Sequence, residues 1–180
     1  MTESDFQVND VANHPARIPD EALIKQCQLE FLRRSGPGGQ HRNKVETAVL
    51  IKHEPTGISA EANESRSQNS NRQSAIHRLR LKLAVQVRTC EQNSAFPTEL
   101  WKSRVTGKKL IVAREHRDYP SLLTEAIDVL TLNDWDHSKA SVKLGISGSQ
   151  LIKFLATYHP AMQLVNDHRI AKGLHALKAN

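Results

Sequence analysis

Ser35-Gly-Pro-Gly-Gly-Gln-His-Arg-Asn-Lys44 is the stretch that decides how this 180-residue chain is interpreted. Glycine visits positive φ freely and proline fixes φ, so three glycines and one proline in four positions give an unusual backbone with little side-chain bulk. Cationic side chains flank these residues, and no carboxylate lies between Leu32 and Lys44. Such a segment can press its backbone against a densely anionic partner, and nucleic acid fits that description best.

The composition supports an anionic partner and argues against several other classes of protein. The net charge is +6, and residues 20–90 hold twelve Lys/Arg against seven Asp/Glu. The two cysteines, Cys27 and Cys90, form no CxxC pair, and the nine histidines show no metal-ligand spacing. No apolar run approaches the roughly 18 to 20 residues of a membrane span, and the N-terminus has no secretory or transit pattern. We therefore expect a cytoplasmic protein with no membrane span, metal or cofactor.

Alternation of apolar and polar residues predicts a small sheet around the glycine-rich stretch. Residues 1–19 are polar and predict a flexible leader, after which Asp20 is expected to cap one short helical turn. A strand around residues 27–31 precedes the stretch, and β-rich residues 45–53 follow it. The Pro/Gly turn at 54–57 then predicts a hairpin with residues 58–62.

A helical pattern replaces this alternation from about residue 70 to residue 92. Ile76, Leu79, Leu83 and Val87 recur at intervals of three and four residues and predict one buried stripe. Basic side chains lie off that stripe, and together they are a candidate phosphate-binding face. They are Arg72, Arg78, Arg80, Lys82 and Arg88.

Helices dominate the second half of the chain. Residues 121–132 and 136–144 carry helical patterns, Ser147 and Gln150 have capping-box spacing, and a last helix runs from Pro160 towards Gly173. Residues 140–157 resemble a helix-turn-helix, with inward positions at Ala140, Leu144, Gly145, Ile146, Leu151 and Leu155. We predict an α+β protein with a leader (1–19), a mixed-sheet domain (20–92), a connecting segment (93–120) and a helical domain (121–180).

The glycine-rich stretch and the blocks after it resemble the catalytic domain of class I peptide chain release factors. The blocks are Thr47-Ala48-Val49, the turn from His53 to Ile58, Arg66-Ser67-Gln68 and Asn71-Arg72, so the resemblance covers roughly residues 18–90. It implies hydrolysis of the ester of peptidyl-tRNA at the ribosomal peptidyl-transferase centre, with Gly38, Gly39 and Gln40 as catalytic residues. The RNA-binding residues that it implies are Arg33, Arg34, Arg42, Lys44, Arg66 and Arg72.

The resemblance also implies partners, and it leaves alternatives open. The expected partners are the ribosome, its large-subunit RNA, peptidyl-tRNA and a methyltransferase acting on Gln40, and the protein itself is expected to be a monomer. A separate codon-reading domain and a long helical arm do not fit into 180 residues, so codon-independent rescue of stalled ribosomes is the favoured function. The alternatives are a ribosomal-RNA-binding protein without hydrolysis and a DNA-binding regulator that uses residues 140–157.

Overall fold

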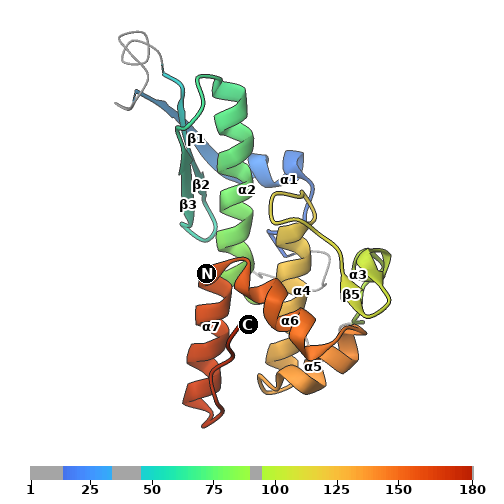
Figure 1. Cartoon of the computed structure of the whole chain (residues 1–180). Coiled ribbons are helices and arrows are strands. Elements are labelled where there is room, and N and C mark those ends of the chain that lie inside the picture. The colour runs from blue at the N-terminus through green and yellow to red at the C-terminus, as the bar shows by residue number, and fades with distance from the viewer. Residues whose placement is uncertain (1–13, 34–45, 90–94, 180) are drawn as a thin grey trace, which may run out of the picture. The chain divides into compact units, whose positions relative to one another are not determined.

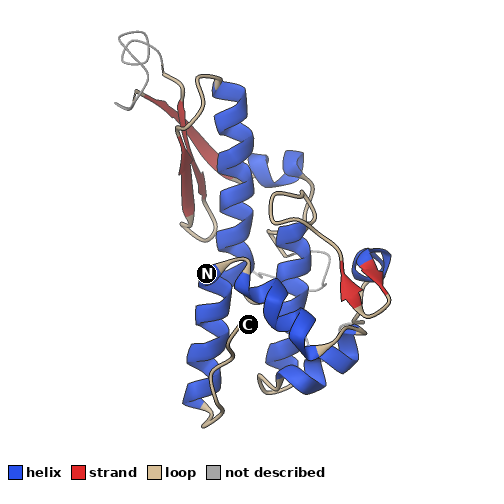
Figure 2. Ribbon diagram, viewed as in Figure 1, coloured by secondary structure: helices blue, strands red, loops and turns tan. Residues whose placement is uncertain are grey.

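A computed structural model describes residues 14–33, 46–89 and 95–179. The described residues divide into two compact units, which we call the sheet unit (within Pro15–Gln86) and the helical unit (residues 87–89 and 95–179, with His14). The described residues contain helices, two small sheets and the loops between them (Figure 2). This combination confirms the predicted α+β class. No helix among these residues is long and apolar enough to cross a membrane.

The sheet unit contains a three-stranded antiparallel sheet with the strand order β1-β2-β3. Its elements are α1 (Asp20–Lys25), β1 (Cys27–Leu32), β2 (Ala48–His53), β3 (Ser59–Ala62) and α2 (Gln68–Gln86). Helix α2 packs against β2 and β3 (Figure 1). The predicted strands and the hairpin across residues 54–57 are confirmed, and Gly57 supplies the positive φ of +71° that this turn requires.

The core of the sheet unit lies between the sheet and α2. Val49 and Ile51 of β2 are fully buried, as are Leu79 and Leu83 of the predicted apolar stripe. The helix ends at Gln86, so Val87, the last predicted member of the stripe, lies beyond it. Leu81 and Val85 are also buried, although they lie off the stripe.

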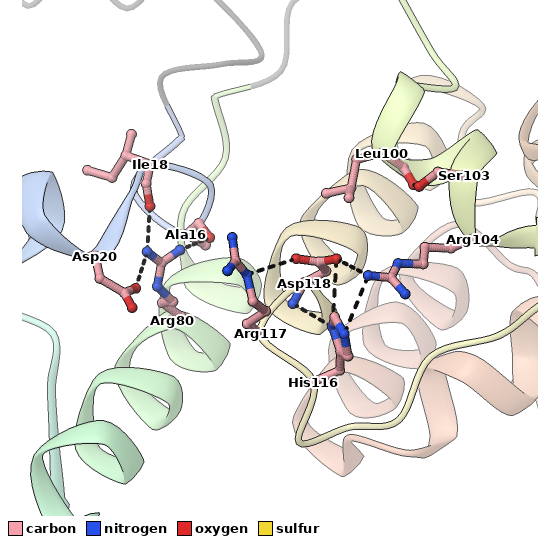
Figure 3. Close-up of polar contacts among 10 residues, drawn as sticks. All are labelled: Ala16, Ile18, Asp20, Arg80, Leu100, Ser103, Arg104, His116, Arg117 and Asp118. Carbon is pink, nitrogen blue, oxygen red and sulfur yellow. Dashed lines mark hydrogen bonds and ion pairs between the residues drawn. The ribbon is translucent and has the colours of Figure 1, made fainter. Parts of the chain in front are cut away.

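The buried guanidinium of Arg80 organises the start of the sheet unit. It donates to the carbonyl of Ala16 at 2.9 Å and to that of Ile18 at 2.5 Å, and it pairs with Asp20 at 2.6 Å (Figure 3). The prediction that Asp20 caps α1 is wrong, because Pro19 occupies the cap position and the Asp20 carboxylate faces Arg80. The end of the segment expected to be a flexible leader is therefore held by α2.

The helical unit is built around one almost completely buried helix. Its elements are α3 (Glu99–Arg104), β4 (Val105–Thr106), β5 (Lys109–Leu110), α4 (Tyr119–Leu132), α5 (His137–Leu144), α6 (Gly148–Ala156) and α7 (His159–Ala171). Every residue of α4 from Leu122 to Leu130 is buried, and α4 packs against both α5 and α7. The predicted helices correspond to α4 to α7, whereas α3 and the β4–β5 hairpin were not predicted.

The helix-turn-helix arrangement predicted for residues 140–157 is present. Gly145 ends α5 with a φ of +69°, and Ser147 Oγ caps α6 by accepting from the N–H of Gln150 at 3.3 Å. The predicted inward residues are buried, with the exception of Gly145, which is exposed at the turn. The indole N–H of Trp101 donates to the carbonyl of Leu144 at 2.8 Å and joins α3 to this turn.

Candidate nucleic-acid interface

The glycine-rich stretch connects β1 to β2 at one end of the three-stranded sheet. Leu32, the last residue of β1, pairs with Ala48, the first residue of β2. The chain therefore leaves and re-enters the sheet at neighbouring positions, and residues 33–47 form the connection between them. Of the predicted site residues, six lie outside the described part of the chain: Arg34, Gly38, Gly39, Gln40, Arg42 and Lys44.

One ion pair links the two ends of this connection. Arg33 follows β1, Glu46 precedes β2, and Arg33 Nε lies 3.3 Å from Glu46 Oε1. Both side chains are more than half exposed, so the pair contributes little to stability. Arg33, predicted to bind RNA, thus has a carboxylate neighbour, and it can exchange that neighbour for a phosphate at small cost.

The first turn of α2 holds the chain where it enters β2. The side-chain amide of Gln68 donates to the carbonyl of Glu46 at 2.8 Å. The side-chain amide of Asn71 donates to the carbonyl of Thr47 at 2.7 Å. Gln68 and Asn71 are three residues apart, which places both on one side of the helix. Both residues belong to the sequence blocks that carry the resemblance, but the sequence predicts no role for either of them.

Asn71 is the centre of this arrangement. It is buried, and its side chain also donates to the carbonyl of Ser65 at 2.9 Å and accepts from the N–H of Ser65 at 2.9 Å. One side chain therefore fixes two segments, the entry to β2 and the turn before α2. We call Gln68 and Asn71 the loop clamp.

Two predicted RNA-binding residues lie close in sequence to the loop clamp. Arg66 is exposed, and in the described part of the chain it makes no ion pair or hydrogen bond. Arg72 is half-buried, and its Nε atom has no hydrogen-bond partner there. Binding of phosphate by these two cations stays a prediction.

The wider basic face predicted for α2 is largely occupied by contacts within the protein. Arg80 is buried against the chain from Ala16 to Asp20, as described above. Arg78 pairs with Glu64 at 2.6 Å, and Lys82 donates to the carbonyl of Ser59 at 2.7 Å. Arg88 lies beyond the helix and pairs with Asp128 at 2.8 Å. The prediction that Arg80 belongs to a phosphate-binding face is therefore wrong, because its side chain is buried within the protein.

The turn between β2 and β3 is fixed by a buried histidine. His53 lies between the Thr56 hydroxyl, 2.8 Å from Nδ1, and the Gln26 side-chain oxygen, 3.0 Å from Nε2. An amide oxygen can only accept, so Nε2 carries the proton and Nδ1 accepts from Thr56. Burial lowers the pKa of His53 below its ordinary value of 6.5. This neutral histidine has a structural role at the end of the sheet away from the glycine-rich stretch.

Other titratable groups of the described residues do not form a second centre. Burial, with a smaller contribution from Glu54, raises the pKa of Cys27 to about 11, so this thiol is not a nucleophile at neutral pH. Among the described residues, no group of three His, Cys, Asp or Glu side chains could hold a metal ion.

Comparison with known proteins assigns the sheet and its connection to a family. The RF-1 domain model matches residues 19–120, which is more than half of the chain. The chain belongs to the class I peptide chain release factor family. The RF-1 match extends past the sheet unit to include α3 and the β4–β5 hairpin, whereas the resemblance noted in the sequence ended near residue 90.

Individual release factors resemble different lengths of this chain. Peptide chain release factor 1 of Malacoplasma penetrans is 34% identical over 170 residues, which cover 91% of this chain and 45% of that protein. Peptide chain release factor PrfB1, chloroplastic, of Arabidopsis thaliana is 48% identical over 102 residues, covering 57% of this chain and 20% of that protein. This chain thus spans less than half the length of these two release factors.

Proposed function

We propose that the protein promotes hydrolysis of the peptidyl-tRNA ester at the ribosomal peptidyl-transferase centre, without reading a codon. Membership of the release factor family and the sequence Gly38-Gly39-Gln40 support the reaction. The observation that carries the proposal is the position of this sequence, in a connection that leaves and re-enters the sheet at the paired residues Leu32 and Ala48. The proposed setting is the cytoplasm, with the protein acting as a monomer.

The proposed chemistry depends on backbone approach and electrostatic stabilisation. Glycine at 38 and 39 leaves no Cβ to collide with the terminal adenosine of the tRNA. The backbone N–H of Gln40 would stabilise the oxyanion that develops when water attacks the ester carbonyl, and its side-chain amide would orient that water. The carbon–oxygen bond to the ribose then breaks, which releases the peptide as an acid and restores the ribose hydroxyl. Ribosome and tRNA supply the remaining groups, so the isolated protein is nearly inert.

The proposed RNA contacts surround the glycine-rich stretch. Arg33, Arg34, Arg42 and Lys44 would bind phosphates of ribosomal RNA or tRNA near the ester, and Arg66 and Arg72 would do so beside the loop clamp. The loop clamp would hold the entry to β2 while these contacts form. Methylation of Gln40 by a methyltransferase partner is part of the same proposal.

Peptide release from ribosomes carrying peptidyl-tRNA and no stop codon tests this function. We expect release with the wild type, little release with Gly39→Ala, and strongly reduced release with Gln40→Ala, while all three proteins co-sediment with ribosomes. Equal release by the three proteins contradicts the proposal. Co-sedimentation without release by the wild type supports a ribosomal-RNA-binding protein instead.

A further inference from the structure

The lysines of the helical unit gather on three elements that contain no acidic residue. These elements are the β4–β5 hairpin, α5 and α6, which we call the cationic block (residues 105–110 and 137–156). The cationic block holds five lysines and no Asp or Glu: Lys108, Lys109, Lys139, Lys143 and Lys153. The remaining described residues of the helical unit from residue 95 onward hold seven Lys/Arg and eight Asp/Glu. The positive charge of this unit is therefore concentrated in one part.

Backbone contacts make the cationic block one structural piece. The N–H of Ser147, at the start of α6, donates to the carbonyl of Lys108 at the tip of the hairpin at 3.2 Å. Helix α6 packs on both α5 and β5. A Cβ at Gly148 would lie 3.6 Å from the ring of His137, which shows that the beginnings of α5 and α6 are in close contact. The hairpin and the helix-turn-helix that carry the five lysines are therefore packed together as one piece.

The hairpin tip is shaped to present its lysines. Gly107 and Lys108 both adopt positive φ, of +53° and +63°, and this is the pattern of the tight turn that joins two short antiparallel strands. Lys108 and Lys109 are exposed, as are the three lysines on α5 and α6. Within residues 14–33, 46–89 and 95–179, none of the five side chains makes an ion pair or hydrogen bond.

Several acidic residues elsewhere in the helical unit are engaged in ion pairs. Asp118 pairs with Arg104 at 2.6 Å and lies 3.6 Å from Arg117 (Figure 3). Asp134 pairs with Lys172 at 2.5 Å. Asp128 pairs with Arg88. Of the five lysines of the cationic block, Lys139 lies in the electrostatic field of Asp134 and Asp136. Among the described residues, Lys108, Lys109, Lys143 and Lys153 make no ion pair, so their charge is available to an external polyanion.

We propose that the cationic block binds the phosphate backbone of double-stranded ribosomal RNA, as a second RNA contact separate from the glycine-rich stretch. This inference rests on the proposed ribosomal function. All five cations are lysines, which contact phosphates as point charges, whereas reading guanine in DNA typically uses the two-pronged guanidinium of arginine. The one aromatic residue of the cationic block, Phe154, is 7% exposed, so stacking on unpaired bases is excluded for it.

A matched pair of variants of the full chain tests the inference. The first variant replaces Lys108, Lys109, Lys143 and Lys153 by Gln. The control removes the same charge from exposed lysines elsewhere, with Lys25, Lys102, Lys172 and Lys178 replaced by Gln. The probes are an RNA duplex of about 20 base pairs and a DNA duplex of the same sequence, titrated between about 50 and 200 mM salt.

The first variant should bind the RNA duplex about tenfold more weakly than the control does. The slope of log K against log salt concentration should also become shallower, by about 1 for each phosphate contact that is lost. Equal binding by the two variants overturns the inference. Tighter binding of the wild type to the DNA duplex overturns the assignment to RNA.

The release assay separates failure of this inference from failure of the proposed function. If both hold, the first variant should need a higher protein concentration for half-maximal release but reach the wild-type maximal rate. If the wild type releases no peptide but the two variants still differ in duplex binding, the proposed function fails and the RNA contact stands. If the first variant releases like the control at every concentration, this RNA contact has no part in release and the inference is overturned.

Discussion

The side-chain amide of Asn71 donates to the carbonyl of Thr47 at 2.7 Å, across 24 positions of sequence. This bond ties the first turn of α2 to the residue that precedes β2, immediately after the connection that carries the glycine-rich stretch. It indicates that α2 serves the proposed site mainly through its first turn, while the rest of the helix packs on the sheet.

Asn71→Ala should lower the free energy of unfolding by about 1–3 kcal/mol, because the half-buried backbone groups of Thr47 and Ser65 lose the buried side chain that pairs with them. Urea unfolding measures this change. Gln73→Ala, at an exposed position of the same helix, is the control and should stay within about 0.5 kcal/mol of the wild type. Equal midpoints for the two variants contradict the role of Asn71.

Gln68→Ala should slow peptide release by about tenfold, because the entry to β2 is less well positioned without the bond to Glu46. The free energy of unfolding should stay nearly unchanged, because the side chain that is lost is exposed. Single-turnover release on programmed ribosomes measures the rate. Asn69→Ala, the exposed neighbour, should release like the wild type. A Gln68→Ala rate equal to that of Asn69→Ala would show that this half of the loop clamp is dispensable.

Arg80→Leu should free the segment around Ala16 and Ile18, whose carbonyls lose a charged donor, and should lower the free energy of unfolding by about 1.5–3 kcal/mol. Limited trypsin digestion with mass spectrometry should show faster cleavage after Arg17. Arg78→Leu removes a guanidinium from the exposed side of the same helix and should cleave there at the wild-type rate. Unchanged cleavage in Arg80→Leu counts against this anchoring.

Trp101→Phe keeps most of a buried aromatic ring but removes the N–H that satisfies the carbonyl of Leu144 at 2.8 Å. We expect a loss of about 1–3 kcal/mol of stability. Relative to the wild type, amide hydrogen exchange should accelerate more in α5 than in α7, because the lost hydrogen bond lies at the end of α5. Uniform exchange across α5 and α7 would contradict a local role for this bond.

His53 should titrate with a midpoint below 6.5, because burial lowers its pKa and its neutral form is hydrogen-bonded on both nitrogens. A lowered pKa means that the unfolded chain takes up the proton first. The contribution of His53 to stability is therefore complete above about pH 6.5 and declines as the pH falls below that value. NMR titration of the imidazole measures the midpoint, and a value at or above 6.5 contradicts the buried neutral form.

Regular local patterns made much of the fold predictable. Alternation around Leu29 and Val49, the turn ending at Gly57, and the Gly145 turn each depend on a few neighbouring residues, and the structure has all of them. The two-residue strands of the β4–β5 hairpin were missed because so short a segment carries no periodicity. Their only signal was Gly107 followed by two lysines, which predicted no more than a loop.

Contacts between distant residues account for the remaining differences. Asp20 was expected to cap a helix, but its partner Arg80 lies 60 positions away in the sequence. No residue near Asp20 in the sequence indicates this pairing. From the sequence, Gln68 and Asn71 could be identified only as part of a resemblance. Their hydrogen bonds to Glu46 and Thr47 could not be predicted, because they depend on how the helix packs beside the sheet. The catalytic residues that we propose rest on the resemblance in the sequence, whereas the side chains that hold the chain at the entry to β2 became visible only in the structure.

The pairing of Leu32 with Ala48 has a consequence for how this protein can change over time. Strand register is set on either side of the connection, by residues 27–32 and 48–53, and within the connection the loop clamp holds Glu46 and Thr47, so changes of sequence between residues 34 and 45 need not alter the pairing of the sheet. The entropy of closing a connection also rises only slowly with its length. Selection can therefore lengthen, shorten or recompose the connection for a new substrate while the folding of the rest of the domain stays untouched.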